Sequence, residues 1–223
     1  MPQPDYTELR RIMVEIIAAY AQASEEITGR SAFHDAVIRS IAEVPRHEFV
    51  PKDVQNYAYA DGPLPIGHDK TISQPFIVAL MVDLLAIEAD DVILEVGTGL
   101  GYCAAVMSKL AKKVFSMEII EELATGARQR LDQFNYSNVE LRIGNGYYGW
   151  QEHAPYDKIL VAAAPEQPPA PLLEQLKPGG RMVLPLGSLD EEQQLMLLEK
   201  DHTGGISMEP VLPVRFAPLV MAH

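Results

Sequence analysis

Cysteine, long apolar runs and a leader pattern are all scarce or missing in this chain. A single cysteine, Cys103, excludes an internal disulfide. No apolar run approaches the roughly 20 residues that a membrane-spanning helix needs. Residues 1–11 lack the basic-then-apolar order of a secretory signal. Together these absences predict a cytoplasmic protein without a membrane partner.

Positive charge is also in short supply. The 223 residues include 18 Lys and Arg against 31 Asp and Glu, which gives a formal net charge of −13 at pH 7. An acidic chain repels nucleic-acid phosphates, so we expect no nucleic-acid partner. His47 and His153 stand in expected loops without further ligands at metal-binding spacing, so we predict no metal site. For the oligomeric state we take a monomer as the starting expectation.

The apolar residues predict helices first and then an alternating pattern. Spacings of three and four predict helices up to about residue 43, with Gly29 ending one and Ser31 capping a second. From Pro75 a helix runs to about residue 85. Strands are then expected at 92–96, 114–117, 139–143, 158–162 and 181–186, with helices at about 101–111, 121–134 and 170–176. After about Gln193 we expect further strands, at least one of them antiparallel.

Short apolar strands that alternate with helices are typical of an α/β fold with a doubly wound, mostly parallel sheet covered on both faces. Residues 56–74 are rich in Gly, Pro, Asp and Tyr and are expected to form an ordered loop with short extended pieces. We predict a single domain over residues 1–223, in which residues 1–50 form a helical extension packed on the rest. Ligands of such sheets bind at the carboxyl ends of the strands.

A glycine-rich turn follows the first of these strands. Residues 95–101 read Glu-Val-Gly-Thr-Gly-Leu-Gly. Glycines let a ligand lie against the backbone, and the helix that follows offers free N–H groups. The spacing is not that of the dinucleotide fingerprint. Glu95 suits a ligand with an ammonium group, such as S-adenosylmethionine, although a tight turn without any ligand is the alternative.

Polar side chains end the next two strands as well. Glu118 can accept two hydrogen bonds from ribose hydroxyls, and Asn145, between two glycines, could reach an adenine edge. Glu118 alone would be interpreted as a solvated acid, and Glu95 alone as a cap of the turn. Three signals at successive strand ends favour an adenosine cofactor. Cys103, just beyond the turn, is expected to be a packed side chain and not a nucleophile.

Other segments resemble the protein-L-isoaspartate O-methyltransferase family. The most specific is Thr71–Pro75, with the sequence Thr-Ile-Ser-Gln-Pro, preceded by Pro65-Ile66-Gly67. Segments 44–51, 59–61, 176–181 and 213–219 are also similar, and the resemblance extends from about residue 40 to the C-terminus. Three departures stand out: Asn145 replaces the family's usual Asp, residues 68–70 fill their loop unusually, and residues 21–33 differ.

The resemblance implies methyl transfer from S-adenosylmethionine to the α-carboxylate of L-isoaspartyl residues in damaged proteins. The ester then closes to a succinimide, whose hydrolysis returns some normal aspartyl linkages, so the reaction is a repair step. Ser73 matches the family's active-site serine. The cofactor-binding residues implied are Thr71, Ile72, Glu95, Gly97, Thr98, Gly99, Glu118, Ile119, Asn145 and Gly146. The substrate-binding residues implied are Pro213, Val214, Arg215 and Phe216.

The expected nucleophile belongs to the substrate. A carboxylate is already ionised at neutral pH, so no general base is required and catalysis should consist of positioning and exclusion of water. The Ser73 hydroxyl could orient this carboxylate with a hydrogen bond. A serine before a helix can instead be its N-cap. Pro75 suits the first helical position, which would make Gln74 the cap and leave Ser73 free.

Two other functions stay open on the sequence alone. One is a methyltransferase of the same fold that acts on another carboxylate or on a small molecule. The other is a module that binds the cofactor without catalysis. A nicotinamide dehydrogenase is disfavoured by the glycine spacing.

Overall fold

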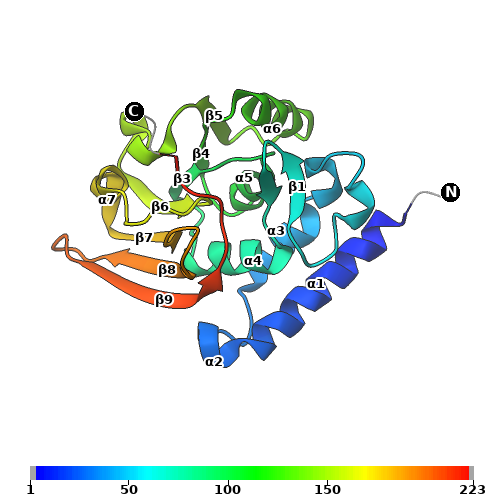
Figure 1. The fold of residues 1–223 in the computed structure, drawn as a ribbon, viewed down its shortest axis with the longest axis horizontal. Helices are drawn as coiled ribbons and strands as arrows, with labels where there is room; N and C mark the ends of the chain where they lie inside the picture. The colour runs from blue at the N-terminus through cyan, green and yellow to red at the C-terminus, as the bar shows by residue number, and fades with distance from the viewer. Residues whose placement is uncertain (1–3, 221–223) are drawn as a thin grey trace.

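The computed structural model describes residues 4–220 and centres on a seven-stranded sheet, with helices on both sides (Figure 1). The strands are β3 (Val92–Val96), β4 (Lys113–Glu118), β5 (Val139–Ile143), β6 (Tyr156–Val161), β7 (Leu176–Leu186), β8 (Gln193–Lys200) and β9 (Ile206–Val214). Their order is β5-β4-β3-β6-β7-β8-β9. Strands β3 to β7 pair in parallel, and β8 and β9 add an antiparallel edge. The predicted mostly parallel, Rossmann-like sheet is confirmed.

The helices are α1 (Tyr6–Ala23), α2 (Glu25–Thr28), α3 (Asp35–Glu43), α4 (Pro75–Leu84), α5 (Tyr102–Ser108), α6 (Glu121–Gln133) and α7 (Ala170–Gln175). Short 3-10 turns cover Arg46–Phe49, Gln55–Tyr57, Gly146–Tyr148 and Gln151–His153. The expected extended pieces before α4 are an antiparallel hairpin, β1 (Leu64–Gly67) and β2 (Lys70–Ile72). No helix within residues 4–220 combines the length and apolarity needed to cross a bilayer.

Two hydrophobic clusters hold the layers together. One joins α1, α3, α4 and α5 to one face of the sheet, and the other packs Trp150 and α7 on the opposite face. In the first cluster Met13 and Ile17 of α1 are fully buried, and they lie on the predicted apolar stripe. Burial of such side chains stabilises the fold by about 1.5–3 kcal/mol each.

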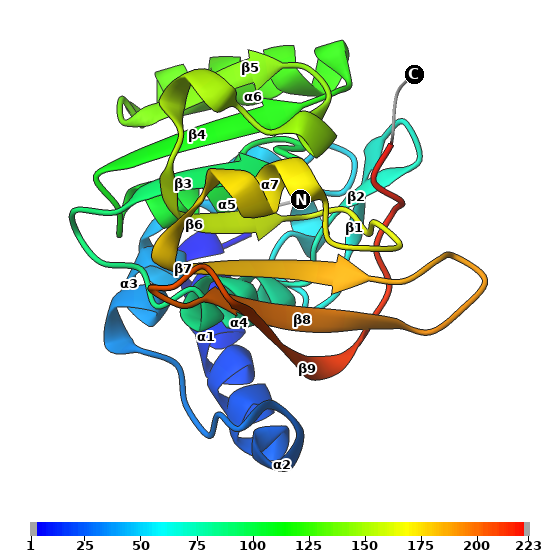
Figure 2. The same ribbon diagram turned by 90° about the vertical axis from the view of Figure 1, so that its left-hand side faces the viewer.

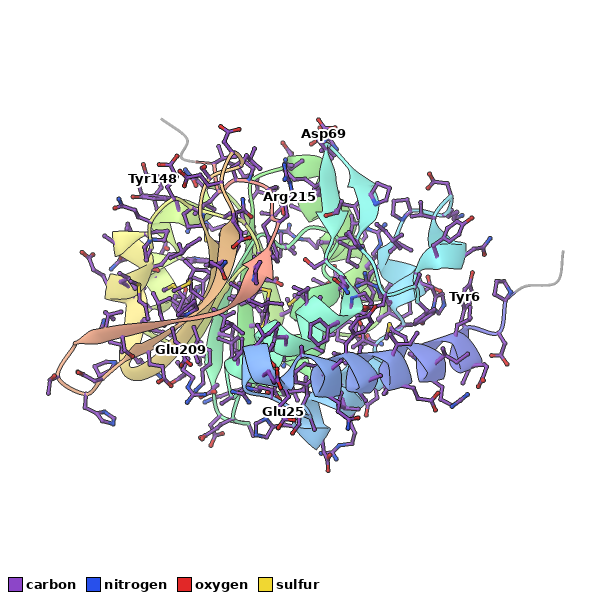
Figure 3. All side chains as sticks on the ribbon, turned by 60° about the horizontal axis from the view of Figure 1, so that its bottom comes forward. Tyr6, Glu25, Asp69, Tyr148, Glu209 and Arg215 are labelled. Atoms are coloured by element: carbon purple, nitrogen blue, oxygen red, sulfur yellow. The ribbon has the colours of Figure 1, made fainter. Side chains whose placement is uncertain are left out.

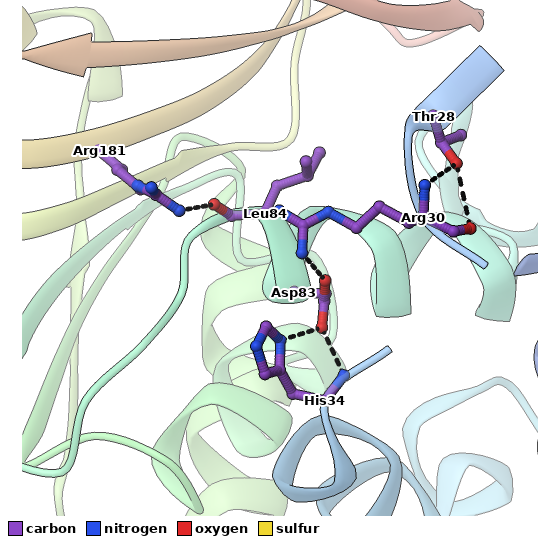
Figure 4. Close-up of polar contacts among 6 residues, drawn as sticks. All are labelled: Thr28, Arg30, His34, Asp83, Leu84 and Arg181. Carbon is purple, nitrogen blue, oxygen red and sulfur yellow. Dashed lines mark hydrogen bonds and ion pairs between the residues drawn. The ribbon is translucent and has the colours of Figure 1, made fainter. Parts of the chain in front are cut away.

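A buried carboxylate ties the N-terminal helices to α4. Asp83 is fully buried and accepts hydrogen bonds from Arg30 Nη1 at 2.6 Å and from the backbone N–H of His34 at 2.7 Å (Figure 4). The second contact fixes where α3 starts: His34 is its N-cap and Asp35 its first residue. The prediction that Ser31 caps this helix is therefore wrong, because a long-range contact sets the boundary. Gly29 ends the short helix α2 in the left-handed conformation, whereas the first helix, which it was expected to end, already stops at Ala23.

The order of the strands places the crevice of the sheet at β3. Strand β3 lies between β4 and β6, so the chain leaves β3 toward one edge of the sheet and returns at β6 on the other side. Doubly wound sheets bind ligands at such a switch point. After β9 the chain crosses back toward the β1–β2 hairpin, so both segments lie at this end of the sheet (Figure 2).

Candidate active site

A cavity of about 840 Å³ opens at the carboxyl ends of β3, β4 and β5. Small-molecule sites commonly have volumes of about 300–1,000 Å³. The structure brings almost every predicted site residue to this cavity. The lining includes Thr71, Ile72, Ser73, Gly97, Thr98, Gly99, Glu118, Ile119, Asn145, Gly146, Pro213, Val214, Arg215 and Phe216. Glu95 is the predicted residue that does not line it.

Two glycines bring backbone against the cavity where a side chain would not fit. Gly97 has a φ of +95°, in the left-handed region, and a Cβ there would approach Ala162 to 3.4 Å. A Cβ on Gly146 would overlap the Cγ1 atom of Val96. A substitution at Gly97 would strain its backbone and one at Gly146 would displace Val96, so both positions keep backbone without a side chain beside the cavity.

The Glu118 carboxylate is held by backbone N–H groups. Its Oε2 accepts a hydrogen bond from Gly99 N at 2.8 Å, and its Oε1 accepts one from Ile120 N at 3.0 Å. The residue is 6% exposed. Each carboxylate oxygen has a further lone pair. The side chain is thus oriented in advance and can still accept hydrogen bonds from a ligand's hydroxyl groups.

Glu95 does not line the cavity, although its neighbours Thr98 and Cys103 do. It is fully buried and opposite Ser116 in the sheet, whose hydroxyl donates to Glu95 Oε2 and also contacts the Thr98 hydroxyl. Burial raises the pKa of Glu95 to about 8, so the group is mostly protonated at neutral pH. Its predicted contact with an ammonium group stays a prediction, and any influence on a ligand would pass through Thr98.

Asn145 is oriented by the turn that follows it. Its Oδ1 accepts a hydrogen bond from Tyr147 N at 3.0 Å, whereas its Nδ2 is buried without a partner in the residues described. An unpartnered buried donor is costly unless a ligand or water satisfies it. Because Asn145 lines the cavity, this donor is available to an acceptor such as an adenine ring nitrogen.

Ser73 is free of the helix that follows it. Helix α4 begins at Pro75 with Gln74 as its N-cap, which is one of the two arrangements that the sequence left open. Asp61 takes over the capping contacts, since its carboxylate accepts from Phe76 N at 3.1 Å and from Gln74 Nε2 at 2.6 Å. The Ser73 carbonyl accepts a hydrogen bond from Arg46. The alternative interpretation of Ser73 as the N-cap is therefore wrong, and its side chain belongs to the cavity wall.

The segment that follows β9 forms another wall of the cavity. Gln193 fixes it, because Gln193 Oε1 accepts from Phe216 N at 2.6 Å and Gln193 Nε2 donates to Phe216 O at 3.2 Å. Arg215 of this segment and Asp69 at the tip of the β1–β2 hairpin line the same cavity and lie on the same side of the molecule (Figure 3). The cavity thus opens between the segment that follows β9 and the β1–β2 hairpin, neither of which belongs to the seven-stranded sheet.

The sequence did not identify every residue of the wall. Leu189, Glu191 and Glu192, in the loop between β7 and β8, line the cavity, as does Tyr102 of α5. No motif marks this loop. Its position after the carboxyl end of a parallel strand is the one signal that could have pointed to it. Cys103 also lines the cavity, and burial raises the pKa of its thiol well above the ordinary value, so it is not a thiolate at neutral pH.

Metal chemistry has no support in the described part of the chain, since no group of three or more His, Cys, Asp or Glu within residues 4–220 could hold an ion. The cavity is lined by a glycine turn after β3, by the oriented carboxylate of Glu118 at the end of β4 and by the amide of Asn145 after β5. On a mostly parallel sheet of this order, these features define a class I S-adenosylmethionine-dependent methyltransferase.

Comparison with known proteins identifies the particular family. The sequence pattern of the family described as Protein-L-isoaspartate(D-aspartate) O-methyltransferase (PCMT) matches residues 22–223. The chain belongs to this family. It is 52% identical over 219 residues to Protein-L-isoaspartate O-methyltransferase 1 of Polaromonas sp. (strain JS666), which covers 98% of this chain and 92% of that protein. The protein of the same name from Cupriavidus necator is 51% identical over 214 residues, which covers 96% of this chain and 83% of the relative.

Solved structures agree with this assignment. A protein-L-isoaspartate O-methyltransferase superposes with a TM-score of 0.81 at 29% identity, over 94% of this chain and 65% of that longer chain. A Plasmodium falciparum structure in complex with S-adenosyl-L-homocysteine superposes with a TM-score of 0.78 at 20% identity, over 99% of this chain and all of the other. The second similarity shows the shared fold.

Proposed function

We propose that this enzyme methylates the α-carboxylate of L-isoaspartyl residues in damaged proteins, and that Ser73 orients that carboxylate. The membership of the family supports the reaction. The observation that supports the role of Ser73 is its freedom: Asp61 and Gln74 cap α4, so the Ser73 side chain lies in the cavity wall without a structural task at the helix end.

The residues of the cavity fit S-adenosylmethionine. Gly97 and Gly146 line the cavity with backbone that carries no side chain, Glu118 offers acceptors for hydroxyl groups, and the Asn145 Nδ2 donor lacks a partner among the residues described. We assign the glycine turn to the amino-acid part of the cofactor, Glu118 to its ribose and Asn145 to its adenine. When bound, the cofactor supplies an activated methyl group on a positively charged sulfur. The protein's task is to hold both reactants and keep water out.

The substrate carboxylate requires no proton acceptor, because it is ionised at neutral pH. The Ser73 hydroxyl can donate one hydrogen bond to it and fix its direction. Ile72, Ile77 and Val78 give the wall an apolar part, next to the polar Thr71 and Gln74. Exclusion of water by these side chains and the bound reactants would favour a reaction in which opposite charges neutralise each other. Positioning of this kind can supply a large part of a rate enhancement.

We propose that Pro213 to Phe216 bind the peptide backbone of the substrate. Strand β9 is the edge of the large sheet, and Pro213 and Val214 are its last two residues. An edge strand can pair with an extended peptide through main-chain hydrogen bonds and so tolerate many side chains. Proteins with varied sequences around the damaged residue would therefore be acceptable substrates. A cytoplasmic location and a monomeric state stay expectations from the sequence.

We further propose that residues 1–50 act as an extension of one domain. The support is the burial of Met13 and Ile17 in the same cluster as α4, together with the contacts of Asp83. A single cooperative unfolding transition is expected for a chain organised in this way.

The test of the Ser73 role is the substitution Ser73→Ala. A hydrogen bond to a charged group is worth about 1.5–3 kcal/mol, so the rate should fall about tenfold to a hundredfold. Calorimetry should show nearly unchanged binding of S-adenosylmethionine. Ser40→Ala is the control, because Ser40 is a buried serine that is bonded to Val37 O and lies outside the cavity, whereas the half-buried Ser73 lines it. It should change stability and leave the rate per folded molecule intact. If Ser73→Ala behaves like this control, Ser73 is structural.

A further inference from the structure

Arg46 is a fully buried arginine that the reaction described above does not use. Its side chain extends from the 3-10 turn Arg46–Phe49 and is 0% exposed. Nε donates to Ala58 O at 2.8 Å and Nη2 donates to Ser73 O at 2.7 Å. The guanidinium lies 4.8 Å from the centre of the Tyr102 ring. Arg46 thus contacts two residues, Ser73 and Tyr102, that line the cavity.

Arg46 forms no salt bridge in the part of the chain described, although the Asp61 carboxylate lies near enough to favour its charged form. None of the ion pairs formed within residues 4–220 includes it, and its Nη1 atom is buried without a hydrogen-bond acceptor. The Tyr102 hydroxyl is buried and unpartnered as well. Burial lowers the pKa of Arg46, yet arginine stays a cation at neutral pH. A buried charge without a salt bridge is a cost to stability, and an apolar side chain of similar volume would avoid it.

We propose that Arg46 is a positioning residue for methyl transfer, which holds the Ser73 backbone and the Tyr102 ring in place and whose positive charge, which forms no salt bridge, attracts the substrate carboxylate toward Ser73. The inference rests on the proposed role of Ser73. Nη2 fixes the carbonyl of Ser73, so the direction of its hydroxyl depends on this contact. The charge acts over a longer distance, through the wall that separates Arg46 from the cavity, where low polarity weakens screening.

The two contributions make different kinetic predictions. Loss of the contact to Ser73 should lower kcat, because the hydroxyl is then less well aligned. Loss of the positive charge should raise the KM for the peptide, because the anionic substrate is attracted less. Binding of S-adenosylmethionine should change little, since Arg46 does not line the cavity. If the role of Arg46 were purely structural, its substitution would change stability but would not produce this pattern of kcat and KM.

The experiment compares Arg46→Met, Arg46→Lys and the control Arg130→Met. Arg130 also donates to backbone carbonyls, Glu48 O at 3.0 Å and Gly126 O at 2.7 Å, and therefore tethers the same turn without contacting Ser73. For each protein, kcat and KM are measured with an isoaspartyl peptide, the cofactor Kd is measured by calorimetry, and the melting temperature is recorded. Wild-type turnover of the peptide is established first, since its absence would refute the proposed function and not the role of Arg46.

Arg46→Met is expected to reduce kcat/KM by about tenfold or more with the cofactor Kd within about twofold of wild type. Arg46→Lys keeps the charge and loses the forked contact, so it should restore the peptide KM and leave kcat low. Arg130→Met should keep both constants. Wild-type kcat and KM in Arg46→Met, whatever its melting temperature, would overturn the proposal. If Arg46→Met does not fold, the Lys variant decides: an unchanged kcat, or a KM raised as much as kcat falls, would overturn it.

Discussion

Replacing Glu95 with glutamine should change how the stability of this protein depends on pH. Glu95 is fully buried, and burial raises its pKa from 4.5 to about 8 in the folded state. Between these two pH values the folded protein keeps a proton that the unfolded chain has released. The free energy of unfolding therefore falls as pH rises through this window, by about 1.4 kcal/mol per pH unit. The amide side chain of the Glu95→Gln variant is neutral at every pH and lacks this dependence.

The difference between the two proteins isolates the contribution of this one group. Urea unfolding of wild type and Glu95→Gln at pH 5.5 and 7.5 should show that wild type loses about 3 kcal/mol more than the variant over that range. All other titrating groups are common to both proteins and cancel. Glu174→Gln, an exposed site, is the control and should follow wild type. Parallel pH dependences in wild type and Glu95→Gln would refute the reasoning, because they would mean that Glu95 is ionised in the folded protein.

Three further substitutions test the cofactor site. Glu118→Ala should weaken S-adenosylmethionine binding about tenfold or more in calorimetry, because it removes both the anchor of Gly99 N and the ribose acceptors; unchanged affinity would show that Glu118 does not face the cofactor. Asn145→Asp should weaken binding a few-fold, because it removes the Nδ2 donor that the site offers to an adenine ring nitrogen; tighter binding would mean that the adenine amino group is the partner of this side chain. Gly146→Ala should lower the free energy of unfolding in urea by about 1–3 kcal/mol, because the new Cβ overlaps Val96. A free energy equal to that of wild type would show that the turn can move to accommodate the Cβ.

The sequence was sufficient to predict the large sheet because its strands are short apolar runs between turn residues. The glycine turn, Glu118 and Asn145 could be predicted for the same reason, since each follows directly after such a run. Of the two caps that the sequence left open for α4, the structure has Gln74, which precedes Pro75, a residue whose fixed φ suits the first helical position. These features depend on neighbours in the chain, so they are visible without a structure.

What could not be predicted depends on residues distant in the chain. The surroundings of Glu95 follow from the pairing of β3 with β4, which sets Ser116 opposite it. The start of α3 follows from Asp83, which lies 49 residues after His34. Arg46 reaches Ser73 across 27 residues and carries no local signal of burial. In each case tertiary structure sets the surroundings of a polar group, so these surroundings cannot be predicted from the residues adjacent in the sequence.

The central claim is that this enzyme recognises the isoaspartyl linkage. The most direct test is methyl transfer to an isoaspartyl peptide and to its aspartyl twin of the same sequence. The isoaspartyl linkage places the free carboxylate one carbon nearer the backbone, and a site that works by positioning should respond to that shift. We predict that wild type methylates the isoaspartyl peptide and leaves the aspartyl twin essentially unmodified, whereas equal rates on the two peptides would contradict the account.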